Sequence, residues 1–155
     1  MQNAMRLLWA LILVASGSFA CAYTIDVQER CASQARAAFQ ELENENKEKY
    51  NPSTLVRNIA SNYQNHYNSE LDRCLLLIKR VFILPLATNL SDQQRQMILV
   101  DANERRPYAT FVETQLATET RARIDKCELE PHIHQKAACL TRNDFDAFVA
   151  TYLEQ

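Results

Sequence analysis

The chain has 155 residues, of which 17 are Lys or Arg and 19 are Asp or Glu, and it contains a single Gly. This length suits one domain with one hydrophobic core. The slightly acidic balance argues against a nucleic-acid-binding protein, which would present a basic face. Because Gly17 is the only glycine, Gly-rich phosphate loops and dinucleotide-binding motifs are excluded.

The first 22 residues have the pattern of a secretory signal peptide. Arg6 supplies the positive charge, residues 7–15 (LLWALILVA) form an apolar run, and Ala20-Cys21-Ala22 fits a signal-peptidase site before Tyr23. The run is too short for a comfortable transmembrane span. We therefore predict export to the periplasm or the cell exterior. The mature chain, residues 23–155, would have no membrane span, and its 16 basic and 19 acidic side chains would give a net charge of −3.

Cys21 supports a second interpretation of this leader. A bacterial lipoprotein is cut just before a cysteine, which then carries lipid and anchors the protein at a membrane surface. Here Ser18 stands where Leu is usual, and Phe19 is bulky for the position that follows. A lipid-anchored envelope protein is thus the alternative to a freely exported one.

Four cysteines remain in the mature chain: Cys31, Cys74, Cys127 and Cys139. An even number in a small exported domain predicts two disulfides. Four cysteines allow three pairings. We favour Cys31–Cys74, which would tie an N-terminal helix to the middle of the chain, with Cys127–Cys139, which would close a short loop. The spacing typical of a four-cysteine zinc site is absent.

The first predicted element is a helix over residues 26–46. Its apolar residues recur at three- and four-residue steps, which places them on one face. They are Val27, Cys31, Ala35, Ala38, Phe39 and Leu42. After Pro52, the residues Leu55, Ile59 and Tyr63 fall at steps of four, which permits a short second helix.

The middle of the chain favours β-structure. Residues 72–83 are the most apolar part of the mature chain and predict a strand that ends at Pro85, with Cys74, Leu76 and Ile78 on one face. Residues 97–100 and 108–113 flank a polar turn and predict a β-hairpin. In the second strand of this hairpin we expect Tyr108, Thr110 and Val112 on one face, and Ala109 and Phe111 on the other.

The end of the chain predicts a loop between Cys127 and Cys139, and then a helix. Asn143 is the expected N-cap, with Asp146 three residues later. The helix has an apolar stripe of Phe145, Phe148, Val149, Tyr152 and Leu153. Because the mature chain has no glycine, we expect asparagines at the turn positions with positive φ.

These elements predict one α+β domain over residues 23–155: an N-terminal helix, a small antiparallel sheet with a hairpin, a C-terminal helix and two disulfides. The alternative is an all-α bundle in which residues 71–83 and 92–100 are helical. Periodicity alone does not separate the two folds in so apolar a stretch.

Several short motifs occur together in this chain. They are Cys31-x3-Ala35-x3-Phe39, His66-Tyr67-Asn68-x2-Leu71-x2-Cys74, Asp101 and Tyr108 around the hairpin, and Phe145-Asp146. The set resembles a loose group of small exported bacterial proteins with an HYN-x-x-L-x-x-C segment and two disulfides. The group has no known activity, so the resemblance implies compartment, disulfides and hairpin but no mechanism. Its members often carry Gly near the hairpin turn, and this chain does not.

His66-Tyr67-Asn68 is the candidate recognition patch, because exposed Tyr and His side chains are effective contact residues. The alternative is a turn, in which Asn68 takes the left-handed conformation and His66 bonds the backbone. The sequence leaves both interpretations open.

His132 and His134 alternate along the chain, so both could point to one side of an extended segment. With Asp125, Glu128 or Glu130 they could hold zinc or copper, or serve a hydrolase. Two ordinary loop histidines are the competing interpretation, since no orienting partner is evident from the spacing. A nucleophile elbow would need glycines, and bridged cysteines supply no thiolate. We therefore assign no catalytic, cofactor-binding or metal-binding residue.

The sequence predicts a small exported domain without enzymatic activity. Its expected role is to bind another envelope or extracellular macromolecule, for example as an inhibitor or immunity protein. The alternatives are an envelope metal-binding protein or hydrolase that uses His132 and His134, and the lipid-anchored protein.

Overall fold

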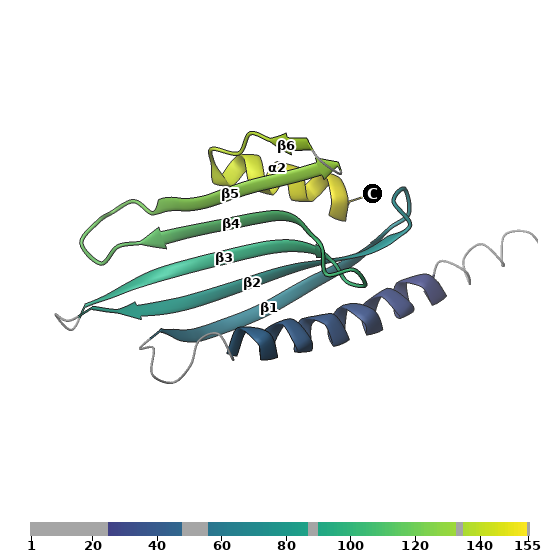
Figure 1. Ribbon diagram of the computed structural model, residues 1–155, viewed down its shortest axis with the longest axis horizontal. Helices are drawn as coiled ribbons and strands as arrows, with labels where there is room; N and C mark the ends of the chain where they lie inside the picture. The colour runs from purple at the N-terminus through teal and green to yellow at the C-terminus, as the bar shows by residue number, and fades with distance from the viewer. Residues whose placement is uncertain (1–24, 48–55, 87–89, 133–134, 155) are drawn as a thin grey trace, which may run out of the picture. The chain divides into compact units, whose positions relative to one another are not determined.

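The computed structural model describes residues 25–47, 56–86, 90–132 and 135–154 (Figure 1). The predicted signal peptide, with Cys21, lies outside these residues. The chain divides into one unit, Met1–Arg30, and a second unit, Cys31–Gln155. The described part of the first unit is helical, and an ion pair of 2.8 Å joins Asp26 to Arg30 within it. The following paragraphs concern the second unit.

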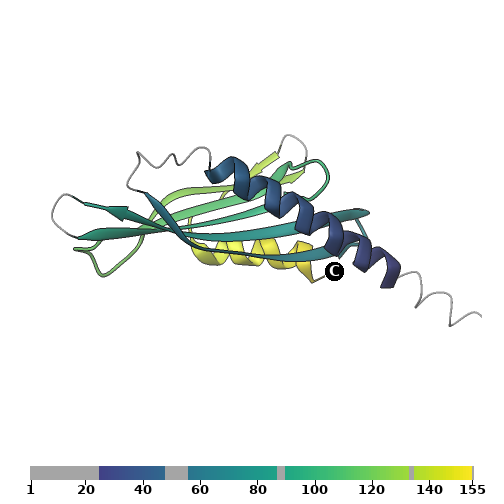
Figure 2. The same cartoon turned by 90° about the horizontal axis from the view of Figure 1, so that it is seen from below.

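The second unit is built on an antiparallel sheet in which each described strand pairs with its neighbour in sequence. The strands are β1 (Arg57–Asn68), β2 (Arg73–Pro85), β3 (Ser91–Asp101), β4 (Pro107–Gln115), β5 (Arg123–His132) and β6 (Gln135–Ala137). Residues 31–47 of the N-terminal helix pack on one face, and α2 (Arg142–Leu153) packs on the other (Figure 2). The predicted α+β fold is confirmed, and the all-α alternative is wrong.

Strand β2 contributes to the core on both faces of the sheet. Leu75 and Leu77 belong to the cluster under α2, whereas Leu76 and Ile78 belong to the cluster under the N-terminal helix. Where a helix covers each side, a strand has no polar face, which explains the continuous apolar run of residues 74–78. The predicted strand, its face with Cys74, Leu76 and Ile78, and its end at Pro85 are confirmed.

The sheet is larger than the sequence predicted. Residues 57–68 form strand β1, so the second helix proposed around Ile59 and Tyr63 is wrong. Strand β3 begins at Ser91 and not at Met97. Residues 123–132 and 135–137 form β5 and β6, so the loop predicted between Cys127 and Cys139 is wrong over these strand residues.

The hairpin of β3 and β4 is confirmed, but the predicted side of Tyr108 is wrong. The pairing shifts between Leu99, which faces Ala109, and Val100, which faces Pro107, so Tyr108 is an extra residue in β4. Such a bulge interrupts the alternation of side chains along a strand. Tyr108 consequently packs against the same cluster as Ala109 and Phe111, with its ring centroid 5.6 Å from that of Tyr152.

Helix α2 has the predicted apolar stripe and a different cap. Phe145, Val149 and Tyr152 are buried, but the N-cap is Thr141 and not Asn143. Thr141 and Asp144 form a capping box, in which each side chain accepts a hydrogen bond from the backbone of the other.

Positive φ occurs at Asp72 (52°) and Arg105 (55°) among the described residues. The expectation that asparagines take these positions is therefore wrong for them. Both lie in β-hairpin turns, where the left-handed conformation reverses the chain. Asp101 stabilises the second turn, because its Oδ1 accepts hydrogen bonds from the backbone N–H groups of Asn103 (2.7 Å) and Glu104 (2.9 Å).

Both favoured disulfides are confirmed. Cys31–Cys74 joins the N-terminal helix to β2 with a Cα–Cα distance of 5.2 Å, and both residues are buried. Cys127–Cys139 joins β5 to the segment before α2 with a Cα–Cα distance of 5.4 Å. Each bridge thus attaches one helix, directly or through its cap, to the sheet.

Candidate functional site

Helix α2 covers only part of its face of the sheet. Beyond Leu77 and Met97, which lie under α2, the strands continue with side chains that are exposed or half-buried on the same face. Their assignment to this face follows from the strand alternation and the pairing register. We call them the open face: Ala60, Asn62, Lys79, Val81, Ile83, Gln93 and Arg95.

The open face is cationic and rich in amides. Lys79 is exposed, and the side chain of Arg95 is 53% exposed. Asn62 and Gln93 add amide donors and acceptors, and the three remaining residues are aliphatic. None of the seven is acidic, although the whole chain has a formal charge of −2. Lys79 and Arg95 are complementary in charge to an acidic surface.

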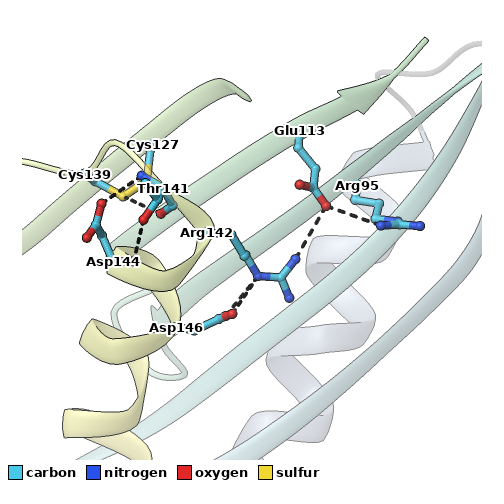
Figure 3. A network of polar contacts seen from close by, with 8 residues as sticks. All are labelled: Arg95, Glu113, Cys127, Cys139, Thr141, Arg142, Asp144 and Asp146. Carbon is cyan, nitrogen blue, oxygen red and sulfur yellow. Dashed lines mark hydrogen bonds and ion pairs between the residues drawn. A yellow bond between two sulfur atoms is a disulfide. The ribbon is translucent and has the colours of Figure 1, made fainter. Parts of the chain in front are cut away.

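A network of arginines and acids lies at the N-terminal end of α2, beside Arg95 of the open face (Figure 3). Oε1 of Glu113 is 3.5 Å from Nη1 of Arg95 and 3.5 Å from Nη1 of Arg142, the first residue of α2. Arg142 also pairs with Asp146 at 2.9 Å and lies 5.6 Å from the centroid of the Phe111 ring. Glu113 is only 13% exposed and pairs with Arg95, so it offsets the charge of that arginine, and Lys79 is the cation of the open face that lies apart from this network.

The opposite face carries a hollow between the N-terminal helix and β1. It has a volume of about 450 Å³ and is lined by Phe39, Gln40, Glu43, Asn44, Lys47 and Ser61. Glu43 is fixed there, because its Oε1 binds Nε of Arg80 at 2.6 Å and its Oε2 accepts a hydrogen bond from Asn58 at 3.4 Å. Within the described part of the chain, the buried hydroxyl of Ser61 has no hydrogen-bond partner.

The structure separates Tyr67 from the other two residues of the candidate recognition patch, His66 and Asn68. The three are the last residues of β1, so neighbouring side chains point to opposite faces. Tyr67 packs toward the cluster under the N-terminal helix and donates a hydrogen bond to Asp72. Asn68 is 0% exposed; it donates to the carbonyl of Tyr152 (3.0 Å) and accepts from the N–H of Leu71 (2.9 Å). Asn68 therefore closes the β1–β2 turn through its side chain.

The side chains of the candidate metal ligands His132 and His134 are outside the described part of the structure. The neighbouring acids have other partners: Asp125 binds Thr114 and Arg123, Glu128 lies 3.0 Å from Lys126, and Glu130 lies 3.9 Å from Arg106. The hydrogen bond from Thr114 is the main reason that the pKa of Asp125 is below its usual value. Among the described residues, no three His, Cys, Asp or Glu side chains are grouped as a metal site would require.

Sequence reasoning missed the open face, although part of its signal was present. Lys79 is the one charged residue in the alternating series Leu75, Leu77, Lys79, Val81, Ile83, and it marks where burial on this face ends. Arg95 and Gln93 lie in a polar stretch before Met97, where no strand was predicted. The hollow left no signal, since its residues come from two elements that are distant in sequence.

None of the described helices has the length and apolarity needed to cross a membrane. Comparisons of this chain with protein-family models, with curated proteins and with solved structures found no match. The resemblance to small exported bacterial proteins thus remains a prediction from the motifs.

Proposed function

We propose that this protein is an exported domain without enzymatic activity that binds an acidic protein through the open face. An inhibitor or immunity protein, which neutralises a partner by binding it, is one concrete form of this function. The observation that carries the proposal is the position of Lys79 and Arg95, which lie exposed among amides and aliphatic side chains where α2 leaves the sheet uncovered.

The sheet suits such a role because it holds these side chains in place. Strand β2 pairs with β1 and β3 along its length, so the backbone under Lys79 is fixed by hydrogen bonds on both sides. A preorganised surface loses less conformational entropy on binding than a flexible loop does. The two disulfides are consistent with an oxidising compartment outside the cytoplasm.

The test is site-specific photo-cross-linking in the cell that produces the protein. A photoreactive residue replaces Lys79 on the open face or, as the matched control, Lys126 of β5. Lys126 is also an exposed lysine, but strand alternation places it on the other face of the sheet. We expect a discrete adduct with an acidic protein from position 79 alone, and Arg95→Glu should abolish it.

Two results would contradict the proposal. One is the same set of adducts from positions 79 and 126, which would indicate collisions and not a binding surface. The other is an adduct at position 79 that Arg95→Glu leaves unchanged, because charge complementarity would then play no part in binding. Raising the salt concentration should weaken the specific adduct, since salt screens exposed charges.

Intact mass spectrometry without reductant tests the export and the competing functions. The proposal requires a chain of residues 23–155 that lacks four hydrogens, as two disulfides demand. A chain that starts at Cys21 and carries acyl groups would establish the lipid-anchored protein. A bound metal that is lost in His132→Ala would favour the metal-binding protein or hydrolase.

A further inference from the structure

We propose that the hollow between the N-terminal helix and β1 binds a neutral saccharide. This site lies on the other face of the sheet from the open face, so the inference does not depend on the proposed function. It rests on the unpaired hydroxyl of Ser61 and on the chemistry of the five side chains that surround it.

The hydroxyl of Ser61 is the first argument. A buried polar group without a hydrogen bond destabilises the fold, and native proteins contain few of them. Ser61 lies on β1 and is one of the residues that line the hollow. A ligand hydroxyl would supply the missing hydrogen bond, since hydroxyls both donate and accept.

The lining of the hollow indicates the ligand class. Gln40 and Asn44 are exposed helix residues whose amides offer donors and acceptors together. The negative charge of Glu43 is balanced by Arg80, and Lys47 is the one other charged side chain of the lining, so uncharged polar groups outnumber unbalanced charges there. A neutral molecule with many hydroxyl groups, such as a saccharide, matches this mixture of donors and acceptors better than an ion or an apolar molecule does.

Phe39 provides the apolar wall that a saccharide also needs. Its ring packs against Tyr63 with centroids 4.6 Å apart, so its orientation is fixed from below. The C–H face of a sugar ring can pack on an aromatic ring while its hydroxyls bind the amides. The volume of about 450 Å³ falls within the range of small-molecule sites and admits a mono- or disaccharide.

The position of Glu43 is fixed independently of any ligand. Arg80 binds Oε1 from β2, and Asn58 donates to Oε2 from β1, so this carboxylate is a preformed part of the wall. The site therefore needs little rearrangement to accept a ligand, which reduces the entropic cost of binding.

The test is a titration of the disulfide-intact protein with N-acetylglucosamine and with its β-1,4-linked dimer, followed by heteronuclear NMR. We expect saturable shifts at Phe39, Asn44 and Ser61, and Ser61→Ala should weaken the binding by about tenfold or more. The matched control, Ser69→Ala, removes an exposed hydroxyl just beyond the same strand and should leave the binding unchanged.

Ser61→Ala also separates ligand binding from folding. Because it removes an unpaired buried hydroxyl, the melting temperature should stay the same or rise. Shifts that are absent, that do not saturate or that are spread over the whole molecule would overturn the proposal. Saturable binding that Ser61→Ala does not weaken would overturn it as well. None of these results bears on the cross-linking at Lys79.

Discussion

Nε of Arg80 lies 2.6 Å from Oε1 of Glu43, and the two side chains are only 6% and 12% exposed. Arg80 comes from β2 and Glu43 from the N-terminal helix, so this buried ion pair joins the helix to the sheet. Arg80 also donates hydrogen bonds to Oε1 of Gln96 (3.1 Å) and to the carbonyl of Leu42 (3.4 Å). The pair thus fixes the end of the helix that forms the hollow.

The first prediction concerns this ion pair. Arg80→Met should lower the free energy of unfolding by about 3–5 kcal/mol, because it leaves the Glu43 carboxylate buried without its counter-charge. The double variant with Glu43→Leu should recover much of that loss, since both charges are then gone. Urea denaturation of the two single variants and the double variant measures the coupling.

The control is the pair of Arg95 and Glu113, in which the arginine is 53% exposed and the carboxylate has a second cation, Arg142, at 3.5 Å. Arg95→Met should cost no more than about 1 kcal/mol, because the arginine is solvated and Glu113 keeps Arg142 as its partner. If Arg80→Met cost as little as Arg95→Met, the buried pair would not hold the helix to the sheet.

The second prediction compares the disulfides. Cys31–Cys74 closes a loop of 43 residues, and Cys127–Cys139 one of 12 residues. A longer closed loop restricts the unfolded chain more, and the chain-entropy model gives a difference of about 1 kcal/mol. The Cys31→Ala/Cys74→Ala variant should therefore be less stable than the Cys127→Ala/Cys139→Ala variant in denaturant titrations. The reverse order would contradict the entropic argument.

The apolar parts of this fold were predictable, and its polar strands were not. Strand β2 has apolar residues on both faces and a proline at its end. This combination is typical of a strand that is buried on both sides. For β1, the spacing of four between Ile59 and Tyr63 suggested a helix. Four residues is also a multiple of the two-residue period of a strand, so this spacing could not decide between them.

Strand β5 shows a second limit of the sequence pattern. Cys127 and Leu129 face the core while Lys126 and Glu128 face solvent, which is the alternation typical of a strand. The pairing with β4 shifts beside Asp125, and this irregularity hides the alternation earlier in the strand. No strand was therefore predicted for the polar residues from 117 to 126.

The candidate site depends on tertiary packing that periodicity does not report. Alternation along β2 predicts that Lys79 shares a face with Leu77, but only the docking of α2 decides that Leu77 is covered and Lys79 is not. That docking is set by contacts distant in sequence, such as the hydrogen bond from Asn68 to the carbonyl of Tyr152.

The third prediction tests Asn68 as a structural residue. Asn68→Ala should lower the free energy of unfolding by about 1–3 kcal/mol, because the N–H of Leu71 and the carbonyl of Tyr152 lose their buried partner. Asn62→Ala, an exposed asparagine of the same strand, should stay within about 0.5 kcal/mol of the wild type. Thermal or urea denaturation decides the matter, and equal effects of the two substitutions would show that the Asn68 bonds contribute nothing.

The fourth prediction concerns pH and the cap of α2. The carboxylate of Asp144 accepts hydrogen bonds from the backbone N–H groups of Leu140 (3.0 Å) and Thr141 (2.8 Å). These bonds, with the one from Leu140 as the largest cause, hold the pKa of Asp144 below its usual value. The unfolded chain then binds a proton at a higher pH than the folded protein does. The resulting stability is present above the unfolded pKa of about 3.9 and is lost as the pH falls through the folded pKa.

Asp144→Asn should therefore lower the melting temperature near neutral pH, and its difference from the wild type should shrink as the pH falls below about 4. The control is Asn143→Ala in the same helical turn, which should change stability by no more than about 0.5 kcal/mol at any pH, because Thr141 and not Asn143 is the cap. Melting curves of the three proteins between about pH 7 and about pH 2 measure both effects. If the melting temperatures of Asp144→Asn and the wild type differed by the same amount at every pH, the charge of the carboxylate would play no part. Ionised and protonated Asp144 would then cap the helix equally well.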